Sequence, residues 1–438
     1  MKRVLVLGAG RVSGPCVQYL LEHPDLRLTV ADQQLANARR VVGEHPRGEA
    51  ITLDVDQEDP RLAIAESDIV VNLLPAEYMA EIARTCVEEG VHMIGATYVT
   101  ETMREYHRRA EESDVLILAE VGLDPGIDHM MAARTADELR REGMVIEGYR
   151  SLCGAIPAHS ANDNPFGYKF SWSPSGALGA ATRPARYLED GRDVEIPGDM
   201  TMKSHFLSHV PGAGWFECYP NGDALPYREL YGMDELKDLY RGTYRFPGWC
   251  ETLAALVELG SLDEQERDLS GLTYRQLTGH LLGAGDEDDL RPLLAERLGV
   301  PEYAAVLCRI TWLGLTDEEQ IPIDRGSPRD VTAGLMLEKL AYAEDERDMV
   351  VMTHEYWVRR PDGQRERLLS TFLDYGQPGG HSSIARTTGL PAAVACKLVV
   401  TGRIDLRGVQ IPTSRTIYEP CLGELERLDI RARERVRM

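Results

Sequence analysis

Apolar residues occur in short continuous runs over the first 125 residues, and helical spacing separates one run from the next. Such runs are typical of strands that are buried on both faces of a parallel sheet. The pattern therefore predicts an α/β fold with a Rossmann-type, doubly wound parallel sheet. The predicted strands are RVLVLG (3–8), LRLTVAD (26–32), AITLDV (50–55), DIVVNLL (68–74), HMIGAT (92–97) and VLILAEVG (115–122), with a first helix over 15–22.

The pattern changes in the middle of the chain. MVIEGYRSLC (144–153) alternates like a strand, and further strand candidates lie near 200–206. Residues 225–300 carry helix-period spacing that ends at glycines, which predicts a helical subdomain with short loops. Residues 349–376 contain two extended runs around a proline–aspartate–glycine turn, the signature of a hairpin.

The tail from 382 to 426 becomes helical again, and these helices need an apolar surface to pack on. The open faces of the N-terminal sheet provide it, so we expect a discontinuous nucleotide domain with other domains inserted. The expected division is 1–125 and 380–438 for the dinucleotide-binding domain, 126–224 and 331–379 for an α/β substrate, catalytic and dimerisation domain, and 225–330 for the helical subdomain.

Composition narrows the class of protein. A hydrophobic fraction of 43% with 27% charged residues is ordinary for a globular protein, and no apolar run approaches the length of a membrane span. The chain begins with a strand rather than a targeting peptide. Eight cysteines without a C-x-x-C pair indicate reduced thiols and no metal site. A net charge of −23 argues against nucleic acid, so we expect a cytoplasmic protein without nucleic-acid or membrane partners.

The segment GAGRVSG follows the first predicted strand and begins a helix. Gly8 permits a tight turn, Gly10 lets the backbone approach a pyrophosphate, and the helix N-terminus attracts the phosphates. Gly14 comes one position later than in the usual motif, because Ser13 stands in that place. Asp32 ends the second strand, where it can bind ribose hydroxyls and repel a 2′-phosphate. The pattern favours NAD over NADP, although the glycines could serve only as a turn.

Other residues are expected to contact the cofactor because of their positions. Asp54 closes the third strand and could reach the adenine, or could be a solvated strand end. The remaining candidates lie in the glycine-rich loop and after the fourth strand: Arg11, Val12, Asn72, Leu73 and Leu74.

Several long motifs then point to a family. The segments GAGRVSGP, NLLPAEY, GATYV, EVGLDPGIDH, NPFGYKFSWSPSGAL, YPNGDALPYRELYG, YRGTYRFPG and GLPAAVACKLVVTG closely resemble the saccharopine dehydrogenase (L-glutamate-forming) family, and the likeness runs from residue 1 to about 426. The resemblance implies a Rossmann domain completed by C-terminal helices, and a homodimer. It also implies an NAD(P)-dependent enzyme that interconverts saccharopine with 2-aminoadipate 6-semialdehyde plus L-glutamate through an imine.

The same resemblance implies the acid–base residues. Tyr98, Asp124 and Cys153 match positions that are implicated in proton transfer in the family. Tyr98 and Asp124 follow predicted strands whose ends face the ligand crevice. Simpler interpretations stay open: a packed ring, a turn residue and a buried small hydrophobe, respectively. Asp128 and His129 are interpreted as a helix cap and a helix-face residue.

The stretch NPFGYKFSWSP (164–174) gathers aromatic residues around one lysine. Saccharopine carries three carboxylates and long methylene chains, so its site needs cations and apolar walls. Lys169, Phe170 and Trp172 would supply both; alternatively, the aromatic side chains pack between domains and Lys169 is exposed. The resemblance adds Thr97, Tyr98, Asp124, Arg241, Thr243 and Arg245 to the substrate site.

One position departs from the family pattern. Gly222 stands where the family carries an arginine that would hold a substrate carboxylate. Either Arg228, Arg241 or Arg245 replaces that charge, or the substrate lacks the carboxylate. Three alternatives therefore stay open: a dehydrogenase of carboxylated polyamine conjugates (carboxynorspermidine- or carboxyaminopropylagmatine-type), a lysine 6-dehydrogenase, and a catalytically silent NAD-binding scaffold.

Overall fold

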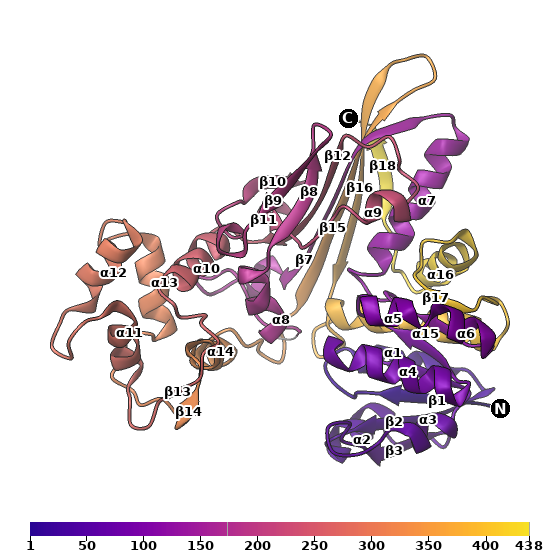
Figure 1. The fold of residues 1–438 in the computed structure, drawn as a ribbon, viewed down its shortest axis with the longest axis horizontal. Coiled ribbons are helices and arrows are strands. Elements are labelled where there is room, and N and C mark those ends of the chain that lie inside the picture. Colours follow the sequence, from indigo (N-terminus) through magenta and orange to yellow (C-terminus); the bar gives the residue numbers. More distant parts are fainter. Residues whose placement is uncertain (173, 438) are drawn as a thin grey trace.

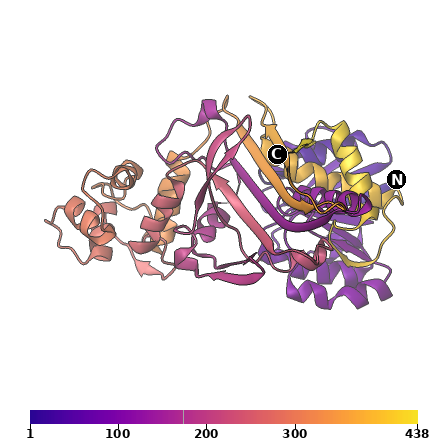
Figure 2. The ribbon, with the colours of Figure 1, turned by 90° about the horizontal axis from the view of Figure 1, so that it is seen from above.

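The computed structural model describes residues 1–172 and 174–437. Three parts follow one another along the longest axis of the molecule (Figures 1 and 2). A doubly wound α/β domain lies at one end, a large mixed sheet lies in the middle, and a group of helices lies at the other end.

The doubly wound domain contains seven parallel strands in the order β17-β6-β5-β4-β1-β2-β3, which confirms the predicted fold class. Strand β6 is shorter than expected, because Glu120 takes a left-handed φ of 58° just beyond it. The strands are β1 (Lys2–Leu7), β2 (Leu26–Asp32), β3 (Gly48–Thr52), β4 (Ile69–Asn72), β5 (His92–Gly95), β6 (Leu116–Leu118) and β17 (Gly408–Gln410). The helices between them are α1 (Ser13–Glu22), α2 (Leu35–Val42), α3 (Arg61–Ala65), α4 (Met79–Glu89), α5 (Glu101–Glu105) and α6 (His107–Glu112).

The predicted tail helices are present as α15 (Ser383–Val400) and α16 (Arg415–Arg427). Helix α15 packs along α1 and over β4 and β5, so the end of the chain completes the first domain. Helix α15 is also long and apolar enough to cross a membrane, which the composition had not led us to expect. Most of it is buried in the core, as expected for the central helix of a domain.

The larger sheet follows the order β10-β11-β12-β7-β15-β16-β18, with β8 paired to β12 and β9 paired to β8. The predicted hairpin is confirmed as β15 and β16. The bounds are β7 (Val145–Pro157), β8 (Ala185–Glu189), β9 (Arg192–Ile196), β10 (Phe206–Val210), β11 (Gly214–Pro220), β12 (Asp238–Arg245), β15 (Asp348–Arg359), β16 (Arg365–Tyr375) and β18 (Arg433–Arg437). Helix α7 (Ile127–Arg141) connects the two sheets.

Two predicted elements are wrong. Residues 238–245 were expected in a helix but form β12, which pairs with β7 on one side and β11 on the other. Their tyrosines and threonine suit a strand, and pairing with distant strands outweighs the local spacing. Residues 200–205 form no strand, since β10 begins only at Phe206. β12 and β18 both belong to the larger sheet, outside the domains to which the sequence assigned them.

The helices beyond β12 largely match the prediction. Those expected from the apolar spacing are α10 (Trp249–Glu258), α11 (Tyr274–Leu282) and α12 (Leu290–Leu298). Helices α13 (Ala305–Leu313) and α14 (Pro328–Lys339) complete the group, and α9 (Tyr227–Leu230) is a single turn before β12.

The larger sheet is buried on both faces. Along β7 and β15, Cys153 and Met352 face the core of the doubly wound domain. The alternate residues Leu152 and Val351 face the core that contains the outer helices. The sheet therefore joins both ends of the molecule through continuous apolar packing.

Candidate active site

The glycine-rich loop lies between β1 and α1. Gly8 has a φ of 91°, and a Cβ there would come within 3.2 Å of the Leu73 backbone. A Cβ at Gly10 would meet no described atom within 4 Å. No side chain in the described parts of the chain caps α1, although the Ser13 N–H donates weakly to the Gly10 carbonyl at 3.4 Å. The loop thus has the open backbone and the helix end that a pyrophosphate requires.

Gly14 lies against the C-terminal segment and also lines the cavity beside the loop. A Cβ at this position would lie 2.8 Å from the His381 ring, in the loop before α15. The carbonyl of Val12 also lies close to α15, 2.4 Å from where a Cβ of Gly389 would stand. Small residues here let the C-terminal segment approach the start of α1.

Asp32 holds the glycine-rich loop in place. Its Oδ2 accepts a hydrogen bond of 2.8 Å from the Ala9 N–H, and its Oδ1 accepts one of 2.9 Å from the Gln34 N–H. The guanidinium of Arg40 donates to the Ala9 carbonyl at 3.3 Å. A carboxylate and a cation therefore both lie beside the place where a ribose would bind.

The other predicted cofactor residues lie in turns at the carboxyl edge of the sheet. Asn72 is buried, and its Oδ1 accepts from the Leu74 N–H at 3.1 Å. The Leu73 N–H donates to Leu7 at 2.9 Å. Asp54 accepts from the Asp56 N–H at 3.1 Å. These bonds shape the edge of the crevice, and contact with a cofactor remains a prediction.

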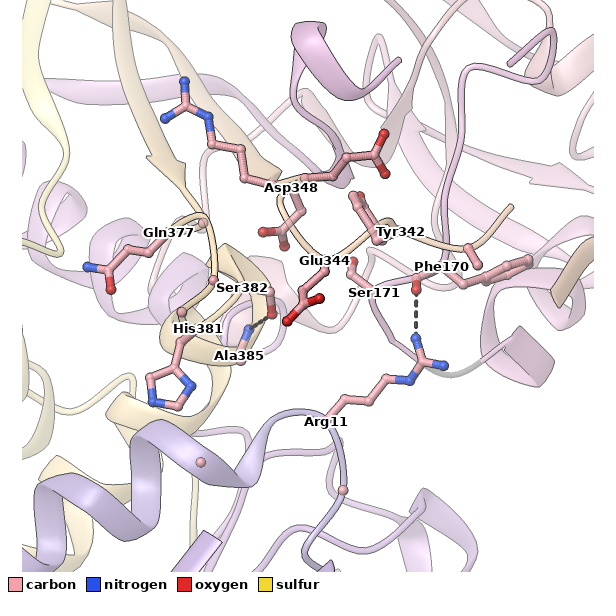
Figure 3. A pocket seen from close by; sticks show the side chains of 18 of the residues that line it. Arg11, Phe170, Ser171, Tyr342, Glu344, Asp348, Gln377, His381, Ser382 and Ala385 are labelled. Atoms are coloured by element: carbon pink, nitrogen blue, oxygen red, sulfur yellow. Dashed lines mark hydrogen bonds between the residues drawn. The ribbon is translucent and has the colours of Figure 1, made fainter. Parts of the chain in front are cut away.

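A cavity of about 600 Å³ opens beside the glycine-rich loop (Figure 3). Gly10 and Arg11 form one wall, and residues 341–348 and 376–382 form much of the rest. The Arg11 guanidinium donates to the Phe170 carbonyl at 2.7 Å, which ties this loop to the aromatic segment of the second domain. The cavity fits a ligand that lies between the domains, but the acid–base residues do not line it.

Those acid–base residues meet at one face of the larger sheet. Arg241, Thr243 and Arg245 alternate along β12, so their side chains share a face. Cys153 pairs with Thr243 in register and belongs to the core of the first domain. This face is therefore directed at the domain that carries the glycine-rich loop.

Tyr98 and Asp124 reach this face from the first domain. The Tyr98 hydroxyl donates to Asp124 at 3.2 Å. The Arg241 guanidinium binds Asp124 closely and also contacts Asp128 at 3.0 Å. Cys153 lies close enough for the Asp124 carboxylate to help raise the pKa of its thiol, although burial is the main cause. The structure thus brings the three predicted catalytic residues together.

The two aspartates that share Arg241 differ in acidity. Burial raises the pKa of Asp124 to about 6, and the Asp128 carboxylate adds to that rise against the opposing effect of Arg241. The pKa of Asp128 is lowered despite its burial, because His129, Arg241 and the Gly126 N–H favour its charged form. Asp124 can therefore gain and lose a proton near neutral pH.

The sequence interpretation missed part of this cluster. Asp128 does cap the local backbone, since its Oδ1 accepts from the Gly126 N–H at 2.6 Å, but its other oxygen binds Arg241. His129 is fully buried, and Glu120 lies 2.8 Å from it. The available signal was a set of charged residues inside an apolar run, because such groups need buried partners. Thr97 borders the cluster, and its carbonyl accepts from the Glu120 N–H.

The structure corrects the prediction for Lys169. Its ammonium contacts Glu346 at 2.6 Å and Asp163 at 2.8 Å, and the residue is only 5% exposed. Lys169 is therefore neither free to bind a substrate carboxylate nor exposed. Phe170 belongs to the core, and the Trp172 indole donates to the Tyr168 hydroxyl at 2.9 Å. The aromatic segment packs the second domain, and its Phe170 also lines the cavity beside the glycine-rich loop.

The candidate arginines differ in whether their positive charge is already balanced by a neighbouring carboxylate. Arg241 is already neutralised by two aspartates, and Arg228 donates to the Asp234 carbonyl at the surface. Arg245 is 2% exposed, and its Nη1 donates only to the adjacent Tyr244 carbonyl. Within residues 1–172 and 174–437, its guanidinium forms no ion pair and its Nε has no partner. A buried cation in this state favours an anionic ligand.

Aromatic rings surround that guanidinium. Tyr168 lies 4.9 Å from it, and Trp249 and Tyr219 lie 5.7 and 5.8 Å away. Gly222 stands at the position where the family carries an arginine. The side chain of Arg183 lies beside it, with its Cδ 4.0 Å from where a Cβ of Gly222 would stand.

The doubly wound sheet, the open glycine-rich loop and the charged face of the larger sheet define the class of multidomain dinucleotide-binding proteins. The comparisons with known proteins narrow the class. Residues 4–118 match the model described as "Saccharopine dehydrogenase NADP binding domain", and residues 122–430 match "Saccharopine dehydrogenase C-terminal domain". The chain belongs to the saccharopine dehydrogenase family.

Individual relatives agree with the family. "Saccharopine dehydrogenase [NADP(+), L-glutamate-forming]" from Saccharomyces cerevisiae is 34% identical, with 97% of each chain covered. The protein of the same name from Schizosaccharomyces pombe is 32% identical over 100% of this chain and 99% of its own. A solved apo structure of the S. cerevisiae dehydrogenase matches all of both chains with a TM-score of 0.90 and 31% identity.

A longer relative matches over only part of its length. "Alpha-aminoadipic semialdehyde synthase, mitochondrial" from Bos taurus is 34% identical over 97% of this chain and 47% of its own, so the chain spans about half of that protein. The family domain and the fungal relatives are named for NADP. The preference for NAD that Asp32 indicated is therefore not supported, and neither are the polyamine, lysine 6-dehydrogenase or scaffold alternatives.

Proposed function

We propose that the chain is an NADP-dependent oxidoreductase that interconverts saccharopine with 2-aminoadipate 6-semialdehyde and L-glutamate. One observation carries the proposal. Asp124, Tyr98 and Cys153 meet at the face of β12 that is directed at the glycine-rich loop. The fungal relatives, which match over nearly their whole length, carry the name of this activity.

Each residue of the candidate site has a separate role in the proposed reaction. Arg245 binds a substrate carboxylate, while the rings around it contact the methylene groups. Asp124 takes a proton from the secondary amine, and the Tyr98 hydroxyl holds the Asp124 carboxylate in position. Bound NADP would accept hydride from the carbon beside that amine. Cys153 keeps its proton and lines the reacting centre, where water then attacks the imine.

The cofactor site is proposed to follow the glycine-rich loop. Gly8 and Gly10 admit the pyrophosphate, and Arg40 offers a positive charge to the 2′-phosphate. Asp32 keeps its hydrogen bonds to the loop. Comparing kcat/KM for NADPH and NADH tests this assignment, and Arg40→Met should lower the value for NADPH several-fold more than that for NADH.

The activity is tested by following NADPH oxidation with 2-aminoadipate 6-semialdehyde and L-glutamate. We expect turnover that requires both compounds, together with the reverse reaction on saccharopine. A parallel assay supplies aspartate semialdehyde with a panel of polyamines. Turnover with the polyamines alone would disprove the proposed substrate, and NADPH binding without any turnover would indicate a silent binding protein.

The pH dependence tests the role of Asp124. In the direction of saccharopine oxidation the base must be ionised, so kcat/KM should fall as the pH drops through about 6, the pKa of Asp124. Asp124→Asn should lower the rate about 10²- to 10⁴-fold and abolish this acid limb. An unchanged limb in the variant would assign the base to another residue.

We also propose that the chain works as a homodimer in the cytoplasm. All eight cysteines, which lie in the described part of the chain, are free thiols, as expected in a reducing compartment. Leu207 and Trp215 are each 60% exposed on the hairpin at the edge of the larger sheet, where a second copy could cover them. Sedimentation velocity should give twice the monomer mass, and Trp215→Arg should lower it if this edge is the interface.

A further inference from the structure

A series of buried polar groups leads from the acid–base site into the protein. The Glu120 carboxylate lies 2.8 Å from the His129 Nε2, and the His129 Nδ1 lies 3.4 Å from the Asp128 carboxylate. Asp128 contacts Arg241 at 3.0 Å, and Arg241 binds Asp124. Each residue of the series thus touches the next.

Glu120 is held in a costly conformation. It is 3% exposed, and its φ of 58° is uncommon for a residue that is not glycine. Its Oε1 accepts from the Val99 N–H at 3.0 Å. Its Oε2 lies 2.8 Å from the His129 Nε2, but the two atoms are not aligned for a hydrogen bond. Neither atom has a hydrogen-bond partner in the described residues. Strain and burial together indicate a constrained functional position.

His129 is fully buried at the start of α7. Its Nδ1 lies 2.6 Å from the Tyr231 hydroxyl, and its ring stacks on Tyr227 at 5.1 Å. The titratable groups that face it from the surrounding elements are Glu120, Asp124, Asp128, Tyr227, Tyr231 and His354, and Arg241 lies next to Asp128.

The charges of this cluster need balancing. Asp124 and Asp128 both contact the guanidinium of Arg241, and the buried Glu120 lies beyond them, next to His129. Uncompensated buried charge is costly, so the cluster needs further protons or cations. His129 lies between two of these carboxylates, with its Nε2 facing Glu120 and its Nδ1 on the side of Asp128.

We propose that Glu120 and His129 form a positioning pair that keeps Asp128 ionised against Arg241 and leaves Asp124 as the group that exchanges a proton with the substrate. The pair acts through Asp128 and Arg241 and does not touch the reacting atoms. The inference rests on the proposed function, because it explains how the acid–base residue of that reaction is set. It assigns a role to two residues of the apolar run around the GLDPG turn.

Two conservative variants test the pair. Glu120→Gln removes a negative charge, so Asp124 ionises more easily and the acid limb of kcat/KM moves to lower pH. His129→Gln removes a group that lowers the pKa of Asp124, so the limb moves to higher pH. Each shift should be on the order of one pH unit. If the pair had only a structural role, both variants would be slower, and the acid limb would stay at the same pH or would move in the same direction in both. Either result would overturn the proposal.

A second readout does not depend on turnover. The folded-state pKa of Asp124 is raised above its usual value of 3.8, so its contribution to stability is present at low pH and is lost as the pH rises through about 6. The difference in thermal midpoint between parent and Asp124→Asn proteins should show this loss. It should occur at lower pH in the Glu120→Gln background and at higher pH in the His129→Gln background.

The two readouts separate the possible failures. Shifts in the stability curves without saccharopine turnover would keep the pair and refute the proposed function. Turnover without shifts in either readout would refute the pair alone. The surface pair His107 and Glu111, 3.5 Å apart on α6, is the matched control, and its glutamine variants should leave both curves unchanged.

Discussion

At the scale of single residues, Arg245 has the most unusual environment in the site. Its guanidinium is buried among aromatic rings and has no anionic partner among the described residues. Arg241 lies four residues earlier on the same face of β12. Its charge is instead neutralised by Asp124 and Asp128. This contrast predicts that the two arginines respond differently to the same substitution.

Arg245→Met should separate binding from stability. The variant removes an unbalanced buried charge, so its thermal midpoint should stay the same or rise. The KM for saccharopine should rise about 10- to 100-fold, the effect of losing a hydrogen bond to a charged group. Steady-state kinetics and thermal unfolding give the two values.

Arg241→Met is the matched control. This variant strands two buried carboxylates, so it should lose about 3–5 kcal/mol of stability. Equal loss of stability in both variants, with an unchanged KM in Arg245→Met, would show that Arg245 has only a packing role.

Residue-scale predictions from sequence succeeded where the position along a strand decides the outcome. Tyr98 and Asp124 follow strands of the parallel sheet, and their side chains do meet. The prediction for Lys169 was wrong because one of its two partners, Glu346, lies 177 residues away, and the sequence does not show which charges pair. The charge balance at Arg245 depends on the same kind of distant contact.

At the scale of elements, the crossing of α1 and α15 positions the glycine-rich loop. A Cβ at Gly389 would lie 2.4 Å from the Val12 carbonyl, directly before the start of α1. The crossing therefore depends on a missing side chain, which the spacing of apolar residues in the tail did not reveal. Local spacing predicted the tail helices correctly but failed for β12, whose pairing is decided by β7 and β11.

Gly389→Ala should destabilise the protein by about 1–3 kcal/mol, because backbone must move to admit the methyl group. The displaced start of α1 should also weaken NADP binding. At Gly423, in the middle of α16, an added Cβ would meet no described atom within 4 Å. Gly423→Ala should therefore gain about 0.5–1 kcal/mol from its higher helix propensity. Chemical unfolding measures both, and equal effects would contradict the proposed crossing.

At the scale of the whole molecule, the larger sheet connects both ends. Cys153 and Met352 belong to the core of the doubly wound domain, while Leu152 and Val351 belong to the core of the outer helices. Arg11 adds a polar link between the glycine-rich loop and the Phe170 carbonyl. Because the cores meet on one sheet, unfolding of either domain exposes apolar surface of the other.

This shared packing predicts that cofactor binding stabilises the distant helices. All five tryptophans lie between residues 172 and 357, outside the doubly wound sheet, so their fluorescence reports on the rest of the molecule. NADP⁺ at about 100 times its Kd contributes about 2.7 kcal/mol to the folded state. The midpoint from tryptophan fluorescence should rise by a few degrees, in step with that from circular dichroism.

Gly10→Ala provides the control for this coupling. Its Cβ would meet no described atom, so the fold should be kept, but the methyl group would stand where the pyrophosphate approaches the backbone. In this variant NADP⁺ should shift neither midpoint. If NADP⁺ moved the circular dichroism midpoint of the parent protein but left its tryptophan transition in place, the domains would unfold independently and the shared core would not couple them.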